Sequence, residues 1–320
     1  MAEYSPMMQH YLATKKQYND CILFYRLGDF YEMFFDDAIT VSKELELTLT
    51  GKDCGQEERA PMCGVPFHAA ETYINRLVSN GHKVAICEQM EDPKLAKGIV
   101  KREVIKVVTP GTNLNAQALD ETKNNYLFCI YYQGDVIGVS ICDFSTGDYF
   151  VTELKSENEL IDEINKFVPS EIIVNEYFAM SGIDLTAVNE KLNISMSTLE
   201  NWYFDEDSSI KKLLSHFKIS ALDGLGVKDY PTGIIAAGAL LTYLYETQKS
   251  DMSHIITLTP YTTGKYMLID SSSRRNLELV ETLREKQKRG SLIWVLDKTK
   301  TAMGARALRS MIEQPLINKD

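Results

Sequence analysis

The segment PTGIIAAGALLTYLYETQ, residues 231–248, is apolar around almost its whole circumference when it is drawn as a helix. A surface helix keeps one polar face, so a helix without one is expected to be buried among other elements. No stretch of the sequence approaches the run of about 18 apolar residues that a membrane-spanning helix needs, and no membrane partner is expected. The chain must therefore build a core that encloses this segment.

Strands precede the apolar segment. Residues 126–154, YLFCIYYQGDVIGVSICDFSTGDYFVTEL, place turn residues at Gln133–Asp135 and Ser145–Asp148 between apolar runs. This pattern predicts three consecutive antiparallel strands. The segments ENELIDEINKF and PSEIIVNE then predict a helix followed by a strand. Together they indicate an α/β domain at residues 126–250.

The first 110 residues predict a separate mixed α/β domain. The opening SPMMQHYLATKKQY is typical of a helix with a Ser N-cap and a Pro at its first position, and CILFYRL predicts a buried strand. Gly28-Asp29 predicts a turn, and apolar spacings of three and four predict a helix from about Phe30 to Leu45. A loop from Met62 to His68, a helix ending at Gly81 and the strands HKVAICEQM and VKREVIKVVTPGT complete this domain.

The net charge of −11 is unevenly distributed along the 320 residues. Residues 1–120 hold 13 basic and 17 acidic side chains, residues 121–250 hold 9 and 20, and residues 251–320 hold 12 and 8. The acidity of the middle segment argues against a polyanion as its partner. Within the first segment, Lys94–Lys106 carries five basic residues and one acidic residue, so a polyanion is not excluded for the ends of the chain.

Sequence motifs for catalysis are absent. The six cysteines form no C-x-x-C pair and no histidine stands at a ligand-like spacing, so we expect no metal site and reduced thiols in a cytoplasm. The N-terminus lacks the basic and apolar regions of a signal peptide. Neither G-x-x-x-x-G-K-[ST] nor G-x-S-x-G occurs. This chain is therefore expected to bear no catalytic residue and no cofactor.

Two carboxylates leave one enzymatic alternative. Asp143 and Asp148, in CDFSTGDY, are paired carboxylates of the kind that binds Mg²⁺ in metal-dependent nucleases. The same STGD sequence is also an ordinary turn between strands. A structure-selective nuclease that uses these two carboxylates is the alternative function.

The stretch YRLGDFYEMFFDDA, residues 25–38, raises a question about Phe30. Phe30 falls in phase with the apolar stripe of the predicted helix, which favours a core side chain. A Phe that follows a glycine turn can also project from the fold and enter a DNA minor groove as a wedge between base steps. Glu32 fits such a surface only if its carboxylate accepts a hydrogen bond from a base, because phosphates repel it. Periodicity alone leaves both interpretations open.

Five sequence blocks, in order, resemble the MutS family of bacterial DNA mismatch-repair proteins. GDFYEMF, PMCGVPFHA and AICEQ…DP…KG…V…VVTPGT resemble its mismatch-recognition domain. LDGLGVKDYPTGIIAAGALLTYL resembles the end of its ribonuclease H-like connector domain, and DSSSRRNLEL with LDKTKTAMGARALRSMIEQPL resembles the start of its helical lever, or core, domain. The resemblance covers the chain from about Ser5 to the last residue.

The resemblance assigns roles to individual residues. It implies that Phe30 stacks on a mispaired or unpaired base from the minor groove and that Glu32 hydrogen-bonds to that base. A mispair is easier to open and to kink than a matched pair, so such a probe responds to deformability and not to sequence. Further residues are candidates to shape the turn that presents Phe30, called the probe turn, or to contact DNA. They are Gly28, Asp29 and Tyr31 for the turn, Met62, Pro66 and His68 for a groove-facing loop, and Lys101, Arg102 and Lys106 for phosphates. The competing interpretations are a core side chain for Tyr31, a purely structural turn for Met62–His68 and a solvated strand face for the three basic residues.

The resemblance also implies a domain order and partners. We expect a mismatch-recognition domain at 1–110, a linker at 111–125, a connector at 126–250 and the truncated start of a helical lever at 251–320. The expected partners are double-stranded DNA with mismatches or small insertion/deletion loops, a MutL-type protein bound through the connector, and a second copy in a full-length homodimer. ATP and Mg²⁺ would bind a C-terminal domain that this chain lacks, and the location would be the bacterial cytoplasm, at the nucleoid.

Overall fold

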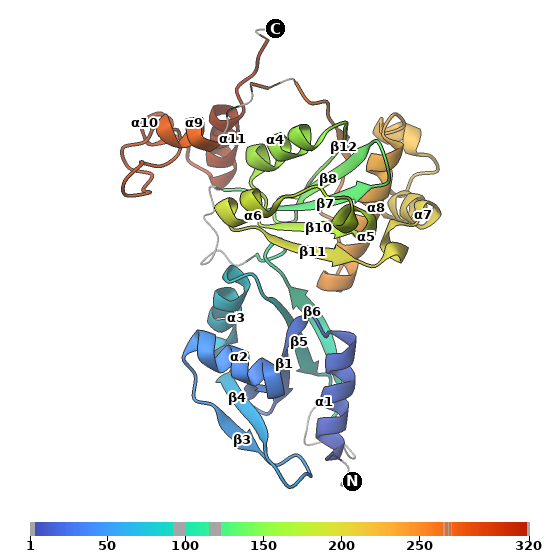
Figure 1. Cartoon of the computed structure of the whole chain (residues 1–320), viewed down its shortest axis with the longest axis vertical. Helices are drawn as coiled ribbons and strands as arrows, with labels where there is room; N and C mark the ends of the chain where they lie inside the picture. Colours follow the sequence, from blue (N-terminus) through green and yellow to red (C-terminus); the bar gives the residue numbers. More distant parts are fainter. Residues whose placement is uncertain are drawn as a thin grey trace. The chain divides into compact units, whose positions relative to one another are not determined.

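The computed structural model describes residues 4–91, 100–114, 123–264, 266–267, 269 and 271–318. Part of the basic stretch Lys94–Lys106 and most of the expected linker 111–125 lie outside the described residues. The chain divides into two compact units: unit 1 comprises residues 1–113 and Glu246–Ser250, and unit 2 comprises Leu114–Tyr245 and Asp251–Asp320. Both units are mixed α/β structures, as the sequence predicts (Figure 1).

Unit 1 is built on a six-stranded sheet with the order β3-β4-β2-β1-β5-β6. Strands β1 and β5 are parallel, and the other neighbours pair antiparallel. Helix α1 covers one sheet face, and helices α2 and α3 cover the other (Figure 1). The elements are α1 (Pro6–Gln17), β1 (Cys21–Leu27), β2 (Phe30–Phe34), α2 (Phe35–Leu45), β3 (Thr50–Lys52), β4 (Ala60–Pro66), η1 (Phe67–Ala69), α3 (Ala70–Ser79), β5 (Lys83–Gln89) and β6 (Arg102–Val108).

The predicted helix from Phe30 to Leu45 is wrong in its first third. Residues Phe30–Phe34 form strand β2, and the helix begins only at Phe35. Gly28, with a φ of +59°, closes a tight hairpin that returns β2 antiparallel beside β1, and β4 pairs with the other edge of β2. Hydrogen bonding on both edges holds these residues extended, so their side chains alternate between the two faces.

The predicted loop from Met62 to His68 is also wrong. Residues Ala60–Pro66 form strand β4, which lies between β3 and β2 and pairs with both. Only Phe67–Ala69 departs from the sheet, as a single 3-10 turn that leads into α3. Of the two partners of β4, β3 directly precedes it, whereas β2 is distant in the sequence, and no local pattern marks that second pairing.

Unit 2 contains a second six-stranded sheet, with the order β11-β10-β7-β8-β9-β12. Strands β7, β8 and β9 form the predicted antiparallel set, and β10, β11 and β12 each pair parallel with a neighbour. Helices α4, α5 and α6 pack on one face, and α7 and α8 on the other. The elements are β7 (Tyr126–Tyr132), β8 (Ile137–Asp143), β9 (Asp148–Leu154), α4 (Glu157–Phe167), β10 (Glu171–Asn175), α5 (Glu176–Met180), α6 (Thr186–Leu192), β11 (Ser195–Leu199), η2 (Asn201–Phe204), α7 (Glu206–Phe217), η3 (Leu222–Leu225), α8 (Pro231–Gln248), β12 (Thr259–Pro260), α9 (Ser271–Asn276), α10 (Leu292–Leu296) and α11 (Ala302–Glu313).

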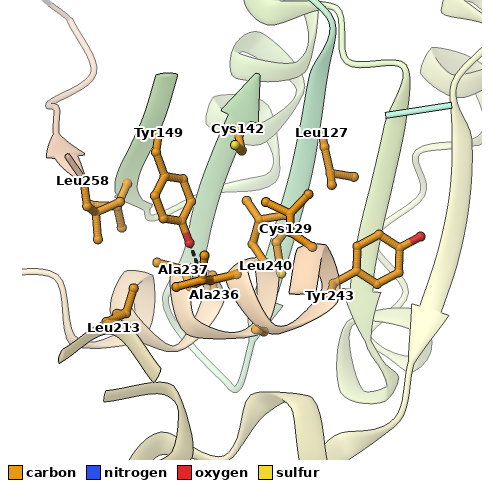
Figure 2. Packing of buried hydrophobic residues seen from close by; sticks show 14 of the residues in the cluster. Leu127, Cys129, Cys142, Tyr149, Leu213, Ala236, Ala237, Leu240, Tyr243 and Leu258 are labelled. Carbon is orange, nitrogen blue, oxygen red and sulfur yellow. Dashed lines mark hydrogen bonds between the residues drawn. The ribbon is translucent and has the colours of Figure 1, made fainter. Parts of the chain in front are cut away.

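Helix α8 is buried, which confirms the expectation from its apolar circumference. Its residues Ala236, Ala237 and Leu240 pack against the sheet, and the hydroxyl of Tyr149 on β9 donates a hydrogen bond to the carbonyl of Ala237 (Figure 2). Oε1 of Glu153 accepts hydrogen bonds from the first backbone amides of α8, at 2.6 and 3.0 Å. The acidic side chain thereby satisfies donors that a helix N-terminus leaves free.

Helices cover less of residues 251–320 than the sequence suggests. Helices α9 and α10 have six and five residues, and residues 277–291 between them are turns and irregular structure. Glu278 adopts a φ of +48°, and its carbonyl accepts a hydrogen bond of 2.9 Å from the amide of Leu292. The chain therefore folds back on itself after α9 instead of extending the helix.

Candidate nucleic-acid interface

Phe30 is a surface residue of unit 1 and not part of its core. It begins strand β2 directly after the Gly28-Asp29 turn, and 46% of its surface is exposed. Phe34, four residues later on the same strand face, is covered by α1, where its ring lies 4.9 Å from that of Tyr11 in an edge-to-face arrangement. Helix α1 thus covers one end of this face and leaves Phe30 available for contact with another molecule.

Tyr31 points to the opposite face and is buried beneath α2 and α3. Its ring packs 6.0 Å from that of Phe24, and its hydroxyl donates a 2.5 Å hydrogen bond to Oε2 of Glu88. Burial, followed by the neighbouring Glu88 carboxylate, raises the pKa of Tyr31. Tyr31 therefore anchors β2 in the core, while its neighbours Phe30 and Glu32 face outward.

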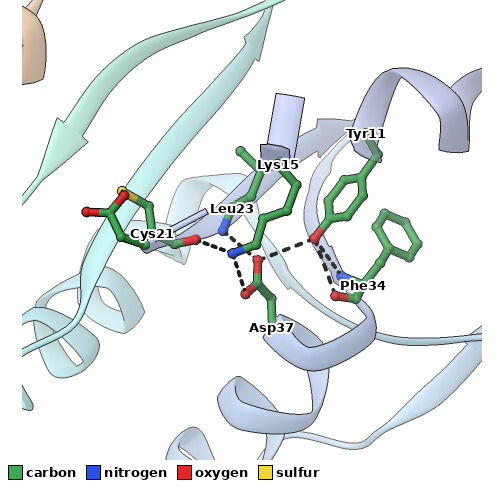
Figure 3. A network of polar contacts seen from close by, with 7 residues as sticks. Tyr11, Lys15, Cys21, Leu23, Phe34 and Asp37 are labelled. Atoms are coloured by element: carbon green, nitrogen blue, oxygen red, sulfur yellow. Dashed lines mark hydrogen bonds and ion pairs between the residues drawn. The ribbon is translucent and has the colours of Figure 1, made fainter. Parts of the chain in front are cut away.

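A buried polar network anchors the other end of β2. Asp37, in the first turn of α2, accepts hydrogen bonds from the amide of Leu23 at 3.0 Å, from Nζ of Lys15 at 2.9 Å and from the hydroxyl of Tyr11 at 3.4 Å (Figure 3). The Tyr11 hydroxyl also donates to the carbonyl of Phe34 at 3.3 Å. The network joins α1, β1 and α2, and so holds the junction from which β2 extends toward Phe30.

Glu32 is paired with Lys52. Oε2 of Glu32 lies 2.5 Å from Nζ of Lys52, with 16% and 32% of the two side chains exposed. Gly64 stands opposite Glu32 on β4 and leaves space beside its carboxylate. A Cβ at this position would lie 3.4 Å from Cγ of Glu32 and 3.2 Å from the carbonyl oxygen of Tyr31. No local pattern marks Lys52 as a partner, because it stands 20 residues from Glu32 in the sequence.

A second exposed aromatic ring lies near Phe30. Phe67 is 44% exposed, and its amide donates a 3.0 Å hydrogen bond to the carbonyl of Asp29 in the probe turn. The guanidinium of Arg26 stacks on Phe67, with Cζ 3.8 Å from the ring centroid, and Arg26 Nε donates to the carbonyl of Gly28. The structure therefore places a cation and a second ring beside the turn that carries Phe30. Neither was singled out from the sequence.

Of the three residues implied for a groove-facing loop, two lie near Phe30. Pro66 is the direct register partner of Phe30, and Met62 is the partner of Phe34 further along β4. His68 is exposed, with its ring 5.8 Å from that of Phe67. Pro66 and His68 thus lie near the probe, whereas half-buried Met62 packs toward the core beneath α1.

The three basic residues implied as phosphate contacts differ in their surroundings. Arg102 is buried and donates from Nε to the carbonyl of Arg26 at 2.8 Å and from Nη1 to that of Val100 at 2.9 Å. These bonds favour a supporting role for Arg102 beneath the Arg26 backbone. Lys101 is exposed and paired with Glu103 at 2.7 Å. Burial lowers the pKa of Lys106, which is half-buried on β6.

The carboxylates considered for a nuclease are engaged in hydrogen bonds of the local turns. Asp143 is fully buried, and its two oxygens accept hydrogen bonds from Asn124, from the amide of Asn125, and from the amide and hydroxyl of Ser145, at 2.6–3.1 Å. Asp148 accepts from Thr146 in the same turn. No group of three or more potential metal ligands occurs among the described residues. Asp143 instead holds the β8–β9 turn and the entry to β7.

Comparison with known proteins identifies the family. Models of MutS domain I, MutS domain II and MutS domain III match residues 5–117, 125–256 and 272–320, in that order. The chain belongs to the MutS family. Phe30 and Glu32 therefore lie within the match to MutS domain I, and Asp143 lies within the match to domain II.

Curated relatives agree with the domain models. The DNA mismatch repair protein MutS of Lachnoclostridium phytofermentans is 65% identical over the whole chain, which covers 34% of that protein. The proteins of the same name from Ruminiclostridium cellulolyticum and Acetivibrio thermocellus are 55% and 54% identical over 99% of the chain, and the chain covers 36% and 37% of their lengths. The chain thus spans about a third of the curated relatives it matches. In the part of the chain that the structure describes, no helix is long and apolar enough to cross a membrane.

Proposed function

We propose that this chain is the part of a DNA mismatch-repair protein that recognises mispaired or unpaired bases in duplex DNA. Phe30 would enter the minor groove at the defect and stack on the base, and Glu32 would accept a hydrogen bond from that base. The observation that carries the proposal is the exposed Phe30 ring, held at the end of a hairpin that is anchored through Tyr31 and the Asp37 network. A wedge needs a rigid support, because the base step has to unstack while the side chain stays in place.

Further residues extend this proposed contact surface. Phe67, stacked on Arg26, offers a second ring and a cation at the same turn, and such pairs bind nucleic acids by stacking and by contact with phosphates. Gly28 and Asp29 shape the turn, and Pro66 and His68 lie beside it. Exposed Lys101 is retained as a candidate phosphate contact.

Expectations for the whole protein form part of the same proposal. The full-length protein would be a homodimer with ATP and Mg²⁺ in a domain outside this chain, so the chain itself would not be an enzyme. A MutL-type protein would bind the connector. The charge of residues 121–250 supports this proposal, because 20 acidic residues against 9 basic ones suit a protein partner better than DNA. We place the four segments at 1–110, 111–125, 126–250 and 251–320.

A cytoplasmic location at the nucleoid is also proposed. Its support is that all six cysteines are buried and unpaired, as is usual for proteins in a reducing compartment.

Fluorescence anisotropy tests the role of Phe30. The full-length protein and its Phe30→Ala variant are titrated at low salt with matched duplex and with duplex that carries one unpaired T. Stacking of one base on an aromatic side chain contributes about 1–3 kcal/mol, so we expect Phe30→Ala to weaken binding to the defect by about 5- to 150-fold. Binding to matched duplex should change little.

A matched control removes an exposed ring elsewhere. Tyr177, on α5 of unit 2, is 50% exposed, and Tyr177→Ala should leave the preference for the defect unchanged. If Phe30→Ala retains the full preference, Phe30 is not the wedge and the proposed function of this surface is refuted.

A further inference from the structure

A carboxylate at a DNA-binding surface is unfavourable unless something compensates its charge. Phosphates repel it, and contact with the groove removes its water. Glu32 nevertheless lies on the same strand face as Phe30, two residues away. The negative charge of Glu32 is compensated by Lys52, whose Nζ lies 2.5 Å from Oε2 of Glu32.

The position of Lys52 is set by the sheet. Lys52 ends strand β3, and β4 lies between β3 and the β2 strand of Glu32. On β4, Lys52 pairs with Ala60 and Glu32 pairs with Gly64, so the Lys52 side chain extends diagonally across β4 to reach the carboxylate. A Cβ at Gly64 would lie 3.4 Å from Cγ of Glu32, so the glycine keeps β4 from crowding the Glu32 side chain.

The environment of the pair permits exchange of partners. Both side chains retain contact with solvent, and Lys52 Nζ also lies 5.7 Å from the centroid of the Phe34 ring. Because both groups remain partly exposed, water can hydrate them when the pair opens. A charge-assisted hydrogen bond from a base N–H can therefore replace Lys52 at the carboxylate.

We propose that Lys52 is a specificity-determining residue: it neutralises Glu32 on every duplex and yields the carboxylate to a base with a free imino N–H. In a matched pair the imino hydrogen is used in pairing, so Glu32 stays with Lys52. At a mispair or an unpaired base such a donor is free to bind Glu32, and the released Lys52 ammonium pairs with a phosphate. This inference rests on the proposed function of Phe30 and Glu32.

A double-mutant cycle in the full-length protein tests the proposal. Dissociation constants are measured by anisotropy for matched duplex and for duplex with one unpaired T. Four proteins are compared: wild type, Lys52→Met, Glu32→Gln and the double variant. On matched DNA, the Glu32 carboxylate of Lys52→Met has neither a lysine nor a base partner and is repelled by phosphates. We therefore expect the dissociation constant of this variant to rise about tenfold for matched duplex and about threefold for the duplex with the defect. Discrimination, the ratio of these two dissociation constants, should then increase about threefold.

The second arm of the cycle isolates the carboxylate. In the Glu32→Gln background no negative charge needs compensation, so Lys52→Met should weaken binding to both duplexes by the same factor. Lys52→Arg, which keeps the charge, should retain the wild-type ratio. Lys43→Met is the control: it removes the same charge from an exposed position of α2, on the opposite face of the sheet, and should leave discrimination unchanged.

Two results would overturn the inference. One is an equal effect of Lys52→Met on both duplexes when Glu32 is present, and the other is a change in discrimination that persists undiminished in Glu32→Gln. If Phe30→Ala abolishes the preference for the defect while either result is obtained, only the role of Lys52 fails. If Phe30→Ala retains that preference, the proposed function fails as well.

Discussion

Gly138, on the central strand β8, allows helix α8 to approach the sheet of unit 2. A Cβ built on Gly138 would lie 2.3 Å from the carbonyl oxygen of Thr232, 2.5 Å from its carbonyl carbon and 2.9 Å from the amide nitrogen of Gly233. All three atoms belong to the backbone of the first turn of α8, so no side-chain rotation relieves the contact. Gly138→Ala therefore forces the helix or the strand to move.

The cost of that movement follows from how firmly both elements are held. β8 is hydrogen-bonded to β7 and β9 on its two edges, and Glu153 binds the first amides of α8. Overpacking of a core usually costs about 1–3 kcal/mol, and a contact with backbone on both sides belongs at the upper end, so we expect a loss of about 2–3 kcal/mol. With a slope of about 1–3 kcal/mol per molar urea, the midpoint should fall by about 0.7–3 M.

Tryptophan fluorescence measures this loss in the correct unit. The two tryptophans of the chain, Trp202 and Trp294, both belong to unit 2. Gly224→Ala is the matched control, because a Cβ there would meet nothing within 4 Å and the residue has no positive φ. Its stability should stay the same or rise slightly. A loss in Gly138→Ala within about 0.5 kcal/mol of the control would refute the packing argument.

Two further predictions concern polar groups. Asp37→Ala removes the acceptor of the hydrogen bonds from the Leu23 amide and from Lys15. The free energy of unfolding of unit 1 should therefore fall by about 2–3 kcal/mol, which is measured as faster hydrogen exchange of the β1 amides. Unchanged exchange would contradict this prediction. Burial lowers the pKa of His216 below 6.5, and its Nε2 lies 2.8 Å from the carbonyl of Ile255. The unfolded chain then binds the proton more readily, so unit 2 should lose stability as pH falls below about 6.5, by urea titration at several pH values. His216→Gln should flatten that dependence, and an unaltered slope would exclude His216 as its source.

Local patterns were sufficient for much of unit 2. Apolar runs separated by turn residues predicted β7, β8 and β9, and the apolar circumference of residues 231–248 predicted the buried helix α8. These predictions succeed because the conformation of each segment depends on neighbouring residues. A turn needs particular residues at a few adjacent positions, and a helix without a polar face has to be buried.

Local patterns failed where distant strands decide the conformation. Residues 30–45 show helical spacing, yet Phe30–Phe34 is extended because β1 and β4 pair with it on both sides. The segment Met62–His68 was expected to be a loop for a similar reason, since its partner strand β2 is distant in the sequence. Pairing of strands overrides the propensity of a short segment.

The sequence by itself determined the family blocks, the buried helix α8 and the residues Phe30 and Glu32 as candidates for the probe. Only the tertiary structure decided that Phe30 is exposed, because exposure depends on what covers a side chain, and α1 covers Phe34 but not Phe30. Likewise only the sheet brought Lys52 to Glu32. Residues far apart in sequence meet where strands pair, and no local pattern records which strands will become neighbours.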